Sequence, residues 1–391
     1  MYLSRLSLTD YRNYAAAEVT LGPGATTIIG ANGQGKTNFV EAAAYLATFG
    51  SHRVATDAPL IRQGADRAVV RGVVSAAGRD SLLEVEINPG RANRVRVNKA
   101  PTRPREALGI LRCVLFAPED IAIVKGDPDQ RRRYLDDLLV SMRPRYAGVR
   151  ADYERVLRQR TALLKSAKAR GAVPPSALDI WDDQLVSAGT VLTAGRLRLV
   201  AAIRPQLADC YSAVSGAQRD TDVRYRMAAA PDAGPGSDLG AGGDLIDRLS
   251  AGEAEPDQEK IALALRDALV ARRRAELERG VCLVGPHRDE LELHIGGLPS
   301  RGYASHGESW SLALALRLAA YQLLRGDGPP GDPVLLLDDV FAELDAGRRD
   351  RLAELVAGAE QVLVTAAVRA DVPDGLAGAR FKVAGGVITD D

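Results

Sequence analysis

The chain has 391 residues, which is enough for two or three domains with a substantial hydrophobic core. Its 51 Lys and Arg residues balance its 51 Asp and Glu residues, so net charge provides no general attraction to nucleic acid or to acidic surfaces. No apolar run approaches the roughly 20 residues of a membrane span, and the first residues lack the apolar core of a secretory signal, so we expect a cytoplasmic protein.

The cysteines and histidines do not suggest a metal centre or a disulfide framework. Cys113, Cys210 and Cys282 are odd in number, far apart and surrounded by apolar residues, which favours reduced, buried thiols. The four histidines have no zinc-ligand spacing with one another or with the cysteines. We predict no zinc site.

Residues 1–117 form a region rich in predicted β-strands. The strand segments are 19–21, 25–29, 68–74, 82–87 and 94–97. A helix is predicted between the second and third strands, because apolar residues recur at helical spacing after Lys36. The region therefore reads as one half of an α/β domain.

A phosphate-binding P-loop lies between the second strand and that helix. Residues 30–37, Gly-Ala-Asn-Gly-Gln-Gly-Lys-Thr, match the pattern G-x-x-x-x-G-K-[ST] at every fixed position. Glycines let the backbone close around phosphates, and the N-terminus of the following helix favours an anion. We expect Lys36 to reach the β- and γ-phosphates and the Thr37 hydroxyl to bind Mg²⁺.

The alternative is a glycine-rich turn that holds no ligand. Because the strand and the helix on either side also fit, we predict that the chain binds a nucleoside triphosphate. The predicted contacts are Gly30, Ala31, Asn32, Gly33, Gln34, Gly35, Lys36 and Thr37.

Residues 118–280 have a mostly helical pattern. The clearest helices are at 136–140, 146–168, 181–211 and 258–279, and a low-complexity loop is predicted at about 228–257. After residue 281 the alternation of strands and helices returns. We therefore predict one nucleotide-binding domain whose halves, 1–117 and 281–391, are separated by a mostly helical second lobe at 118–280.

Charge is segregated within this second lobe. Residues 142–171 carry nine basic residues against two acidic ones, and residues 232–259 carry eight acidic residues against one arginine. A basic helical face suits a nucleic-acid backbone, and a solvated helix face is the alternative. The candidate DNA contacts in this stretch are Arg143, Arg145, Arg150 and Arg158.

The last region contains two further candidate motifs. Ser305-His306-Gly307-Glu308 precedes an apolar helix, as an anion-binding turn would, although Ser and Gly are also ordinary helix caps. Residues 334–337 form an apolar strand that ends in Asp338 and Asp339. Beside a P-loop, Asp338 fits a Mg²⁺ ligand, and Asp339 fits a general base for the attacking water.

Two short segments complete this region. A second buried strand is predicted at 361–365. Glu343 and Asp345 open the helix that follows Asp339, where an acidic helix cap is a compatible interpretation.

The motifs occur in the order found in ABC-type ATPases, and the P-loop and Asp338 are roughly 300 residues apart. Transporter ATPases keep these motifs much closer, whereas SMC-type ATPases separate them by an inserted arm. Blocks 11–14 (Tyr-Arg-Asn-Tyr), 116–120 (Phe-Ala-Pro-Glu-Asp) and 285–289 (Gly-Pro-His-Arg-Asp) agree with this comparison. Together with 30–38 and 305–345, they make the chain resemble the RecF family of bacterial recombination mediators, least strongly at 172–259.

The resemblance implies an α/β fold of the ABC-type ATPase class, with a mixed β-sheet and a P-loop, split by the second lobe. It also implies that ATP drives dimerisation, with the signature turn of one subunit closing over the γ-phosphate bound by the other. Ser305, Gly307 and Glu308 would act there in trans. A site completed in trans links ATP binding to dimerisation thermodynamically.

Several single positions also take their expected roles from the resemblance. Arg12 and Asn13 would contact phosphate from the first hairpin, with an exposed turn as the alternative. Arg53 would touch DNA or phosphate, with an ordinary surface charge as the alternative. Glu119 and Asp120 replace a glutamine loop that senses Mg²⁺ in related ATPases, and their role is left open.

The resemblance also implies a weak, DNA-stimulated ATPase that hydrolyses ATP slowly to ADP and phosphate. Glu343, Asp345 and Thr365 would be switch or dimer residues. Thr365 stands where many relatives have a switch histidine, and a threonine cannot act as acid or base near neutral pH. Asp339 replaces the longer glutamate of transporters.

We therefore expect an ATP-switched, DNA-binding clamp that acts in recombinational DNA repair, replication-fork maintenance and the SOS response. ATP and Mg²⁺ are the expected cofactors. DNA, RecR, RecO and a second copy of the chain are the partners that the resemblance implies. The alternatives are the ATPase subunit of a transporter and a nucleotide-gated scaffold that does not hydrolyse ATP.

Overall fold

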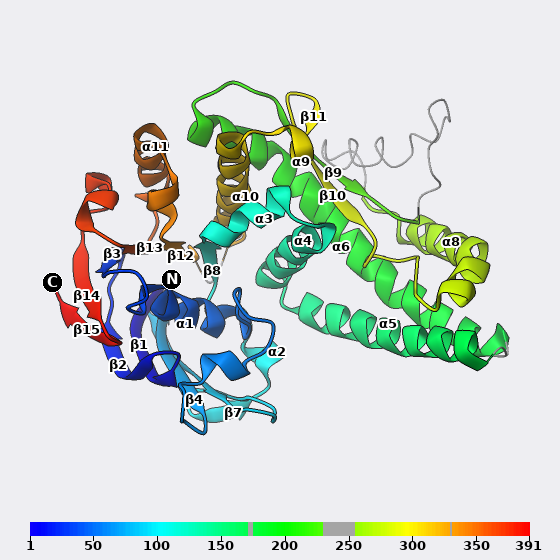
Figure 1. Ribbon diagram of the computed structural model, residues 1–391, viewed down its shortest axis with the longest axis horizontal. Coiled ribbons are helices and arrows are strands. Elements are labelled where there is room, and N and C mark those ends of the chain that lie inside the picture. Colours follow the sequence, from blue (N-terminus) through cyan, green and yellow to red (C-terminus); the bar gives the residue numbers. More distant parts are fainter. Residues whose placement is uncertain (171–174, 230–254, 329–330) are drawn as a thin grey trace. The chain divides into compact units, whose positions relative to one another are not determined.

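The computed structural model describes residues 1–170, 175–229, 255–328 and 331–391 (Figure 1). The chain divides into two compact units. Unit 1 consists of Met1–Ile121, Cys210–Ala217 and Trp310–Asp391, and unit 2 consists of Ala122–Asp209 and Gln218–Ser309. The predicted loop at about 228–257 falls almost entirely outside the described residues.

The first sheet of unit 1 is antiparallel, with the strand order β2-β1-β4-β5-β6-β7. Its strands are β1 (Tyr2–Tyr11), β2 (Tyr14–Thr20), β4 (Ala68–Ala76), β5 (Arg79–Ile87), β6 (Arg94–Val97) and β7 (Ala100–Thr102). The sequence pattern did not predict β1. A β-bulge between Leu3 and Arg5 shifts its register, so the buried Leu3, Leu6 and Leu8 do not alternate evenly along the strand.

The second sheet of unit 1 is mostly parallel, with the strand order β15-β14-β3-β13-β12-β8. Its strands are β3 (Gly24–Ile29), β8 (Cys113–Phe116), β12 (Val334–Asp338), β13 (Gln361–Ala366), β14 (Ala379–Ala384) and β15 (Val387–Asp390). Every residue of β12 and β13 is buried, as their apolar sequences predicted. Strands from the two ends of the chain therefore alternate in one sheet.

Helix α1 (Lys36–Thr48) packs between the two sheets and forms the centre of the unit 1 core. It contacts β4 and β5 on one side and β8, β12 and β13 on the other. Gly72 on β4 allows this approach, because an added Cβ would lie 2.6 Å from Leu46 Cδ1 and 2.8 Å from Leu3 Cδ1. The helix is thereby fixed with its first residue at the end of the P-loop.

Shorter helices complete unit 1. They are α2 (Pro104–Ala107), α11 (Ala346–Val356) and the 3-10 helices η1 (Ala58–Leu60), η2 (Pro118–Asp120), η3 (Val340–Glu343), η4 (Arg369–Asp371) and η5 (Asp374–Leu376). Helix α10 (His306–Gly326) begins in unit 2 and continues into unit 1, where Leu312, Ala313 and Leu316 are fully buried.

Unit 2 is mostly helical, as predicted, and also contains a small antiparallel sheet. Its helices are α3 (Ile121–Lys125), α4 (Pro128–Met142), α5 (Arg145–Arg170), α6 (Pro175–Ser215), which ends in unit 1, α8 (Gln258–Arg279) and α9 (Ser300–Tyr303). The sheet has the order β11-β10-β9, with β9 (Thr221–Arg226), β10 (Glu290–Ile295) and β11 (Leu298–Pro299).

The division between units differs from the predicted boundary at residue 281. Residues 281–309 lie in unit 2, because β10 pairs with β9 from Glu290↔Arg226 to Ile295↔Thr221. A strand that pairs with a distant partner cannot be assigned to a domain from its local sequence pattern alone.

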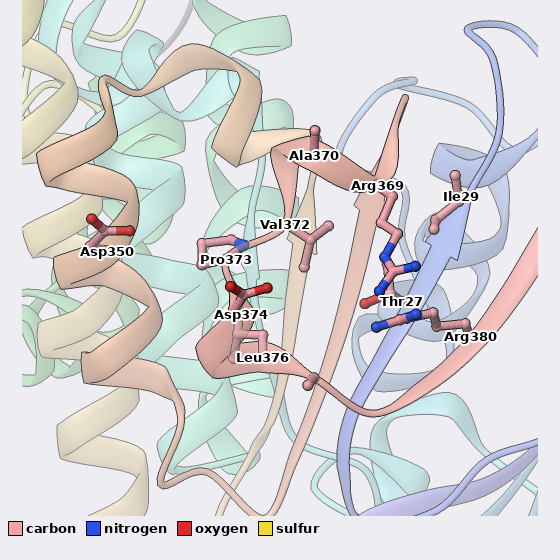
Figure 2. Close-up of a pocket in the computed structure, with 11 residues that line it drawn as sticks. Thr27, Ile29, Asp350, Arg369, Ala370, Val372, Pro373, Asp374, Leu376 and Arg380 are labelled. Carbon is pink, nitrogen blue, oxygen red and sulfur yellow. The ribbon is translucent and has the colours of Figure 1, made fainter.

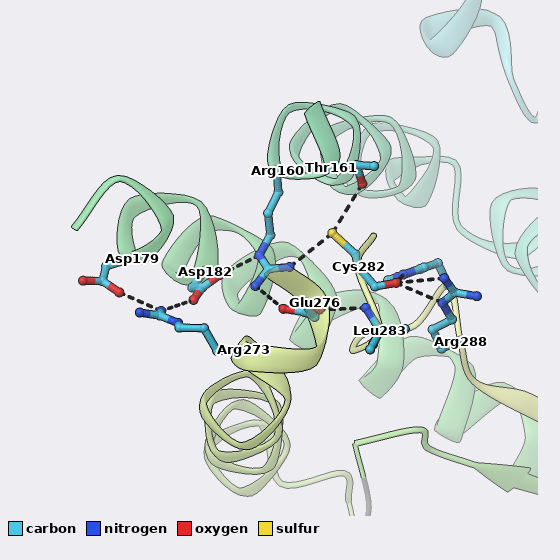
Figure 3. A network of polar contacts seen from close by, with 10 residues as sticks. Arg160, Thr161, Asp179, Asp182, Arg273, Glu276, Cys282, Leu283 and Arg288 are labelled. Atoms are coloured by element: carbon cyan, nitrogen blue, oxygen red, sulfur yellow. Dashed lines mark hydrogen bonds and ion pairs between the residues drawn. The ribbon is translucent and has the colours of Figure 1, made fainter. Parts of the chain in front are cut away.

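A buried network of charged side chains holds unit 2 together (Figure 3). Arg160 on α5 is fully buried and donates to Asp182 on α6 and to Glu276 on α8, each at 2.6 Å. Its Nη1 also donates to Cys282 Sγ at 3.2 Å. One guanidinium therefore joins three helices and the segment that follows α8.

Helix α6 contains an 18-residue window that is apolar enough to cross a membrane by length and composition. The protein itself buries 72% of that window, as in the core helix of a soluble protein, so this helix is weak evidence for a membrane span.

Candidate nucleotide-binding site

The P-loop connects β3 to α1 in a conformation that requires glycine. Gly33 and Gly35 have φ values of +78° and +121°, which L side chains rarely adopt. Space is also restricted, since a Cβ on Gly30 would lie 2.4 Å from Val383 O and one on Gly35 would lie 2.7 Å from Asn13 Nδ2. Both the backbone angles and the close approach explain the glycines of the motif.

Neighbouring segments hold the P-loop in shape. From the β1–β2 turn, Asn13 Nδ2 donates to Gln34 O at 2.8 Å and the Tyr14 hydroxyl donates to Gly35 O at 2.9 Å. From the β14–β15 turn, Gly385 N donates to Gln34 Oε1 at 2.7 Å. The loop is thus preorganised by hydrogen bonds to both turns.

Four predicted site residues lie together where the loop enters α1. Lys36 Nζ is 3.4 Å from Ala31 O and 3.8 Å from Asp339 Oδ2, and its side chain is 3% exposed. The Thr37 hydroxyl donates to Asp338 Oδ1 at 3.1 Å. The structure therefore brings residues about 300 positions apart into one cluster of a lysine, a hydroxyl and two carboxylates.

Thr365 links the carboxylate of Asp338 to the backbone amide of Asp339. Its hydroxyl donates to Asp338 Oδ1 at 2.7 Å and accepts a hydrogen bond from Asp339 N at 2.9 Å. Burial raises the pKa of Asp338 to about 6, and the carboxylates of Asp339 and Glu119 add to this effect, whereas the hydroxyl bonds from Thr365 and Thr37 oppose it.

This donor set fits a divalent cation. Asp338 and Thr37 offer oxygen ligands of the kind that Mg²⁺ prefers, and the repulsion between neighbouring carboxylates would be relieved by a cation.

Arg12 is bound to a carboxylate that the sequence pattern did not reveal. Its Nε and Nη2 donate to the two oxygens of Glu41 at 2.8 and 2.7 Å, and Glu41 on α1 is fully buried. Burial alone would raise the pKa of Glu41, but hydrogen bonds from Arg12 and Ser51 outweigh it and lower the pKa. The guanidinium of Arg12 is thereby engaged by Glu41, and Asn13 contacts the P-loop itself.

Arg53 lies next to the first turn of α1. Its Nη1 donates to Asn38 Oδ1 at 3.0 Å and is 3.5 Å from Glu41 Oε2, and its side chain is 34% exposed. Asn38 in turn donates to Asn13 Oδ1 at 2.8 Å. A partly exposed positive charge therefore stands beside the P-loop.

Glu119 and Asp120 have different surroundings. Asp120 is buried, accepts from Ala117 N at 3.0 Å and from Arg317 Nη2 at 2.6 Å, and so ties η2 to α10. Glu119 is exposed, and its charge acts on Asp338. The charge of Glu119 is therefore linked to the carboxylate cluster, whereas Asp120 has a structural contact.

The Ser305–Glu308 turn forms a reciprocal cap at the start of α10. Glu308 N donates to Ser305 Oγ at 3.2 Å, and Ser305 N donates to Glu308 Oε2 at 2.9 Å. Glu308 Oε1 also accepts from Arg219 Nη1 at 2.6 Å. This turn belongs to unit 2, whereas the P-loop belongs to unit 1.

The acidic residues after β12 include a helix cap. Asp345 Oδ1 accepts from Arg348 N at 2.9 Å, which makes Asp345 the N-cap of α11. Glu343 is exposed at the end of η3.

The basic stretch on α5 is less continuous than its sequence suggests. Arg150 pairs with Asp137 and Glu154 at 3.0 Å each, Arg160 is fully buried, and Arg145 lies over the ring of Tyr146. Arg158 is 70% exposed, and its distance of 3.9 Å from Glu154 makes a weak ion pair. Arg143, just before α5, donates to Met142 O. Arg158 is thus far more accessible than Arg150, whose side chain is 34% exposed.

A separate cavity of about 560 Å³ lies on the other face of the β3 strand (Figure 2). Thr27 and Ile29 line it, whereas Ile28 points into the core that contains α1. Figure 2 shows Arg369 and Arg380 side by side there. Asp350 and Asp374 also line the cavity, so its charges balance and do not select an anion.

Sequence reasoning missed three residues that shape these sites: Glu41, Asn38 and Arg219. A signal was present for Glu41, because a lone glutamate among the apolar residues of α1 requires a buried partner. Arg219 carried no signal, since it lies in a segment without a recognisable motif.

Comparison with known sequences gives a consistent result. The family model described as RecF/RecN/SMC N terminal domain matches residues 2–375. The chain is 56% identical to the DNA replication and repair protein RecF of Kineococcus radiotolerans over 97% of this chain and 96% of that protein. It is also 56% identical to the protein of the same name from Frankia alni, over 99% of both chains.

Comparison with solved structures agrees. The recombination mediator protein RecF-ATP in the RecFOR pathway matches with a TM-score of 0.87 and 26% identity, over all of this chain and 97% of that chain. An SMC head bound to the C-terminal winged-helix domain of ScpA matches with a TM-score of 0.54 and 16% identity, over all of this chain and 96% of that chain. The second likeness concerns the fold alone.

Proposed function

Because the chain belongs to the RecF family of DNA replication and repair proteins, within the RecF/RecN/SMC group of ATPases, we propose that it is an ATP-switched DNA clamp. The observation that carries this proposal is the cluster of Lys36, Thr37, Asp338 and Asp339 at a preorganised P-loop. The solved structure of RecF-ATP from the RecFOR pathway supports ATP as the nucleotide.

The residues of unit 1 have distinct roles in this proposal. Backbone N–H groups of the P-loop and the Lys36 ammonium bind the β- and γ-phosphates, with Arg53 as a second nearby cation. Thr37 and Asp338 would hold Mg²⁺, which offsets phosphate charge when it is bound. Arg12 positions α1 through Glu41, and Asn13 fixes the loop that contacts phosphate.

Hydrolysis needs a water molecule and a base. The water oxygen attacks the γ-phosphorus, the bond to the β-phosphate oxygen breaks, and ADP and inorganic phosphate leave. Asp339 accepts the proton of the attacking water. Lys36 Nζ lies 3.8 Å from Asp339 Oδ2, and Thr365 positions Asp339 N without exchanging a proton. A short carboxylate and a threonine in these places make hydrolysis slow.

The second half of the site comes from another copy of the chain. Ser305, Gly307 and Glu308 form the turn that closes over the γ-phosphate held by the partner, and Glu343 and Asp345 lie at the dimer contact. ATP binding then closes the dimer on DNA, and hydrolysis opens it. Arg53, Arg143, Arg145, Arg150 and Arg158 are the candidate DNA contacts.

RecR and RecO are the proposed protein partners. Support comes from a RecF relative described as acting in the RecFOR pathway. A transporter ATPase subunit is disfavoured by full-length similarity to DNA repair proteins.

Size-exclusion chromatography with light scattering tests this function. The wild type should be monomeric alone and dimeric with ATP-Mg²⁺, more so when duplex DNA is present. Lys36→Ala should stay monomeric under all conditions, whereas Lys260→Ala, at an 84% exposed lysine of α8, should behave as the wild type. A wild-type chain whose mass does not respond to ATP and DNA would refute the clamp.

A further inference from the structure

The turn that would close over the γ-phosphate carries a negative charge of its own. Glu308 caps Ser305, and the hydrogen bonds from Ser305, followed by the charge of Arg219, lower the pKa of its carboxyl group. Glu308 is therefore ionised near neutral pH. A carboxylate in this position repels a triphosphate unless a cation lies close to it.

Arg219 supplies such a cation. It lies between the end of α6 and the start of β9, and its Nη1 is 2.6 Å from Glu308 Oε1. Its side chain is 59% exposed, and Glu308 is its only polar partner among the described residues. Its Nε and Nη2 groups are thus available to a ligand in the part of the chain that the structure describes.

The ion pair between Arg219 and Glu308 allows Arg219 to bind a phosphate as well. An ion pair exposed to solvent contributes little to stability, so Arg219 can reorient at little energetic cost. A guanidinium also presents several N–H groups in a plane that matches phosphate oxygens. Arg219 can hold Glu308 with one nitrogen and donate to a phosphate with the others.

We propose that Arg219 donates hydrogen bonds to the γ-phosphate of the nucleotide that a second copy of the chain binds. This inference rests on the proposed function, because it requires the ATP-dependent dimer. Arg219 keeps its protons throughout and stabilises the charge on the phosphoryl group as it is transferred.

The first experiment compares two arginines on adjacent segments of unit 2. Arg226 on β9 is 61% exposed and lies 2.6 Å from Glu292 Oε1, so Arg226→Ala removes a matched surface ion pair. Arg219→Ala should lower the kcat of ATP hydrolysis about 100-fold, as the loss of one transition-state donor does. Arg226→Ala should keep wild-type turnover, and Arg219→Lys should recover only part of the loss.

A mixing experiment tests action in trans. Arg219→Ala retains its P-loop and Asp339, and Asp339→Asn, which should still dimerise with ATP but not hydrolyse it, retains its Arg219. In a mixed dimer, the P-loop of the first therefore meets the intact arginine of the second. An equal mixture should regain about one quarter of wild-type turnover, because half of the dimers are mixed and each has one complete site of two. An inactive mixture would place Arg219 in cis and overturn the proposal.

A double variant separates phosphate contact from neutralisation of Glu308. If Arg219 only offsets the carboxylate, Glu308→Gln should restore activity to Arg219→Ala, and this rescue would overturn the proposal. Failure of the proposed function gives a different result, namely a wild type that does not dimerise with ATP. If the wild type dimerises and Arg219→Ala matches Arg226→Ala, only the role of Arg219 is wrong.

Discussion

Two adjacent carboxylates at the end of β12 are kept chemically different. Asp338 is 2% exposed, and burial raises its pKa to about 6, whereas the side chain of Asp339 is 29% exposed and 3.8 Å from Lys36 Nζ. The backbone separates them, because Asp339 has φ of +49° and so leaves the strand direction. One carboxylate thereby suits a cation and the other suits a water molecule.

Asp339→Asn should separate ATP binding from hydrolysis. Asparagine tolerates the left-handed backbone at this position, so the fold is retained. Without a base, the single-turnover rate of ATP hydrolysis should fall by about 100-fold or more. The ATP-bound dimer should consequently persist longer in light scattering. Unchanged hydrolysis would remove Asp339 from the role of base.

For single residues, the sequence predicted local motifs but not the side chains that pair over long sequence distances. The P-loop and Asp338-Asp339 follow from short patterns with one chemical purpose. Arg12 was expected on a phosphate, yet Glu41, 29 positions away, binds it. Asp120 pairs with Arg317, 197 positions away, and no sequence pattern indicates such a pair.

At the level of elements, the Arg160 network fixes three helices of unit 2. Glu276 is fully buried, accepts from Arg160 Nη2 at 2.6 Å, and accepts from Leu283 N at 2.7 Å. Burial would lower the pKa of Arg160, but the bond and charge of Glu276 outweigh it and raise the pKa. The network is therefore stable only when every member is present.

Glu276→Ala should destabilise unit 2 by about 3–5 kcal/mol, because it breaks a buried ion pair and leaves Arg160 with Asp182, which it shares with Arg273, as its one carboxylate partner. Glu278→Ala is the matched control on the same helix, since Glu278 is 63% exposed and pairs with the exposed Arg274, and should cost less than about 1 kcal/mol. Urea unfolding of both variants in a Trp310→Phe background reports on unit 2 through Trp181. Equal midpoints would contradict this role of the network.

His287 should make the stability of unit 2 dependent on pH. Burial lowers its pKa from 6.5 to about 4, and the charges of Arg288, Arg132 and Arg160 act in the same direction. Its Nδ1 is 2.6 Å from the Tyr153 hydroxyl. Below pH 6.5 the unfolded histidine takes up a proton that the folded one does not, so stability is present above pH 6.5 and lost as pH falls to about 4.

The loss over this range should reach about 3 kcal/mol. His287→Gln should flatten the dependence, whereas His306→Gln, at the exposed start of α10, should not. Urea midpoints at several values between pH 7 and pH 4 measure the difference. A wild-type slope that survives in His287→Gln would assign the effect to another group.

Elements were predictable where apolar residues recur regularly. The long helices and the strands β12 and β13 have such patterns, and the structure confirms them. Strand β1 was not predicted from the sequence because a bulge interrupts its alternation of buried residues. Strands β9 and β10 were not predicted because each is short and half exposed.

At the level of the whole molecule, DNA binding should depend strongly on salt. Phosphate contacts release counterions, so each lost contact reduces the slope of log K against log[salt] by about 1. Arg158→Ala should show this reduction, whereas Arg274→Ala, at a 92% exposed arginine of α8, should not. Fluorescence anisotropy of labelled duplex DNA over a salt series gives the slopes. If Arg158→Ala leaves the slope unchanged, Arg158 on α5 does not contact a DNA phosphate.

The division of the molecule could be predicted only in outline. The sequence pattern predicted a helical insertion, but it did not predict the residue at which the chain re-enters unit 1. Residues 281–309 join unit 2 through the pairing of β10 with β9, and this pairing involves residues more than 60 positions apart.

The position of β3 also has a consequence for synthesis of the chain. This strand precedes the P-loop and is translated early, yet both of its sheet neighbours, β13 and β14, come from the last 31 residues of the chain, Gln361–Asp391, as do the Gly385 and Gly386 amides that hold Gln34. A nascent chain on the ribosome therefore carries the P-loop sequence long before it has a P-loop. The proposed ATP site can therefore form only after β13, β14 and the β14–β15 turn have been translated.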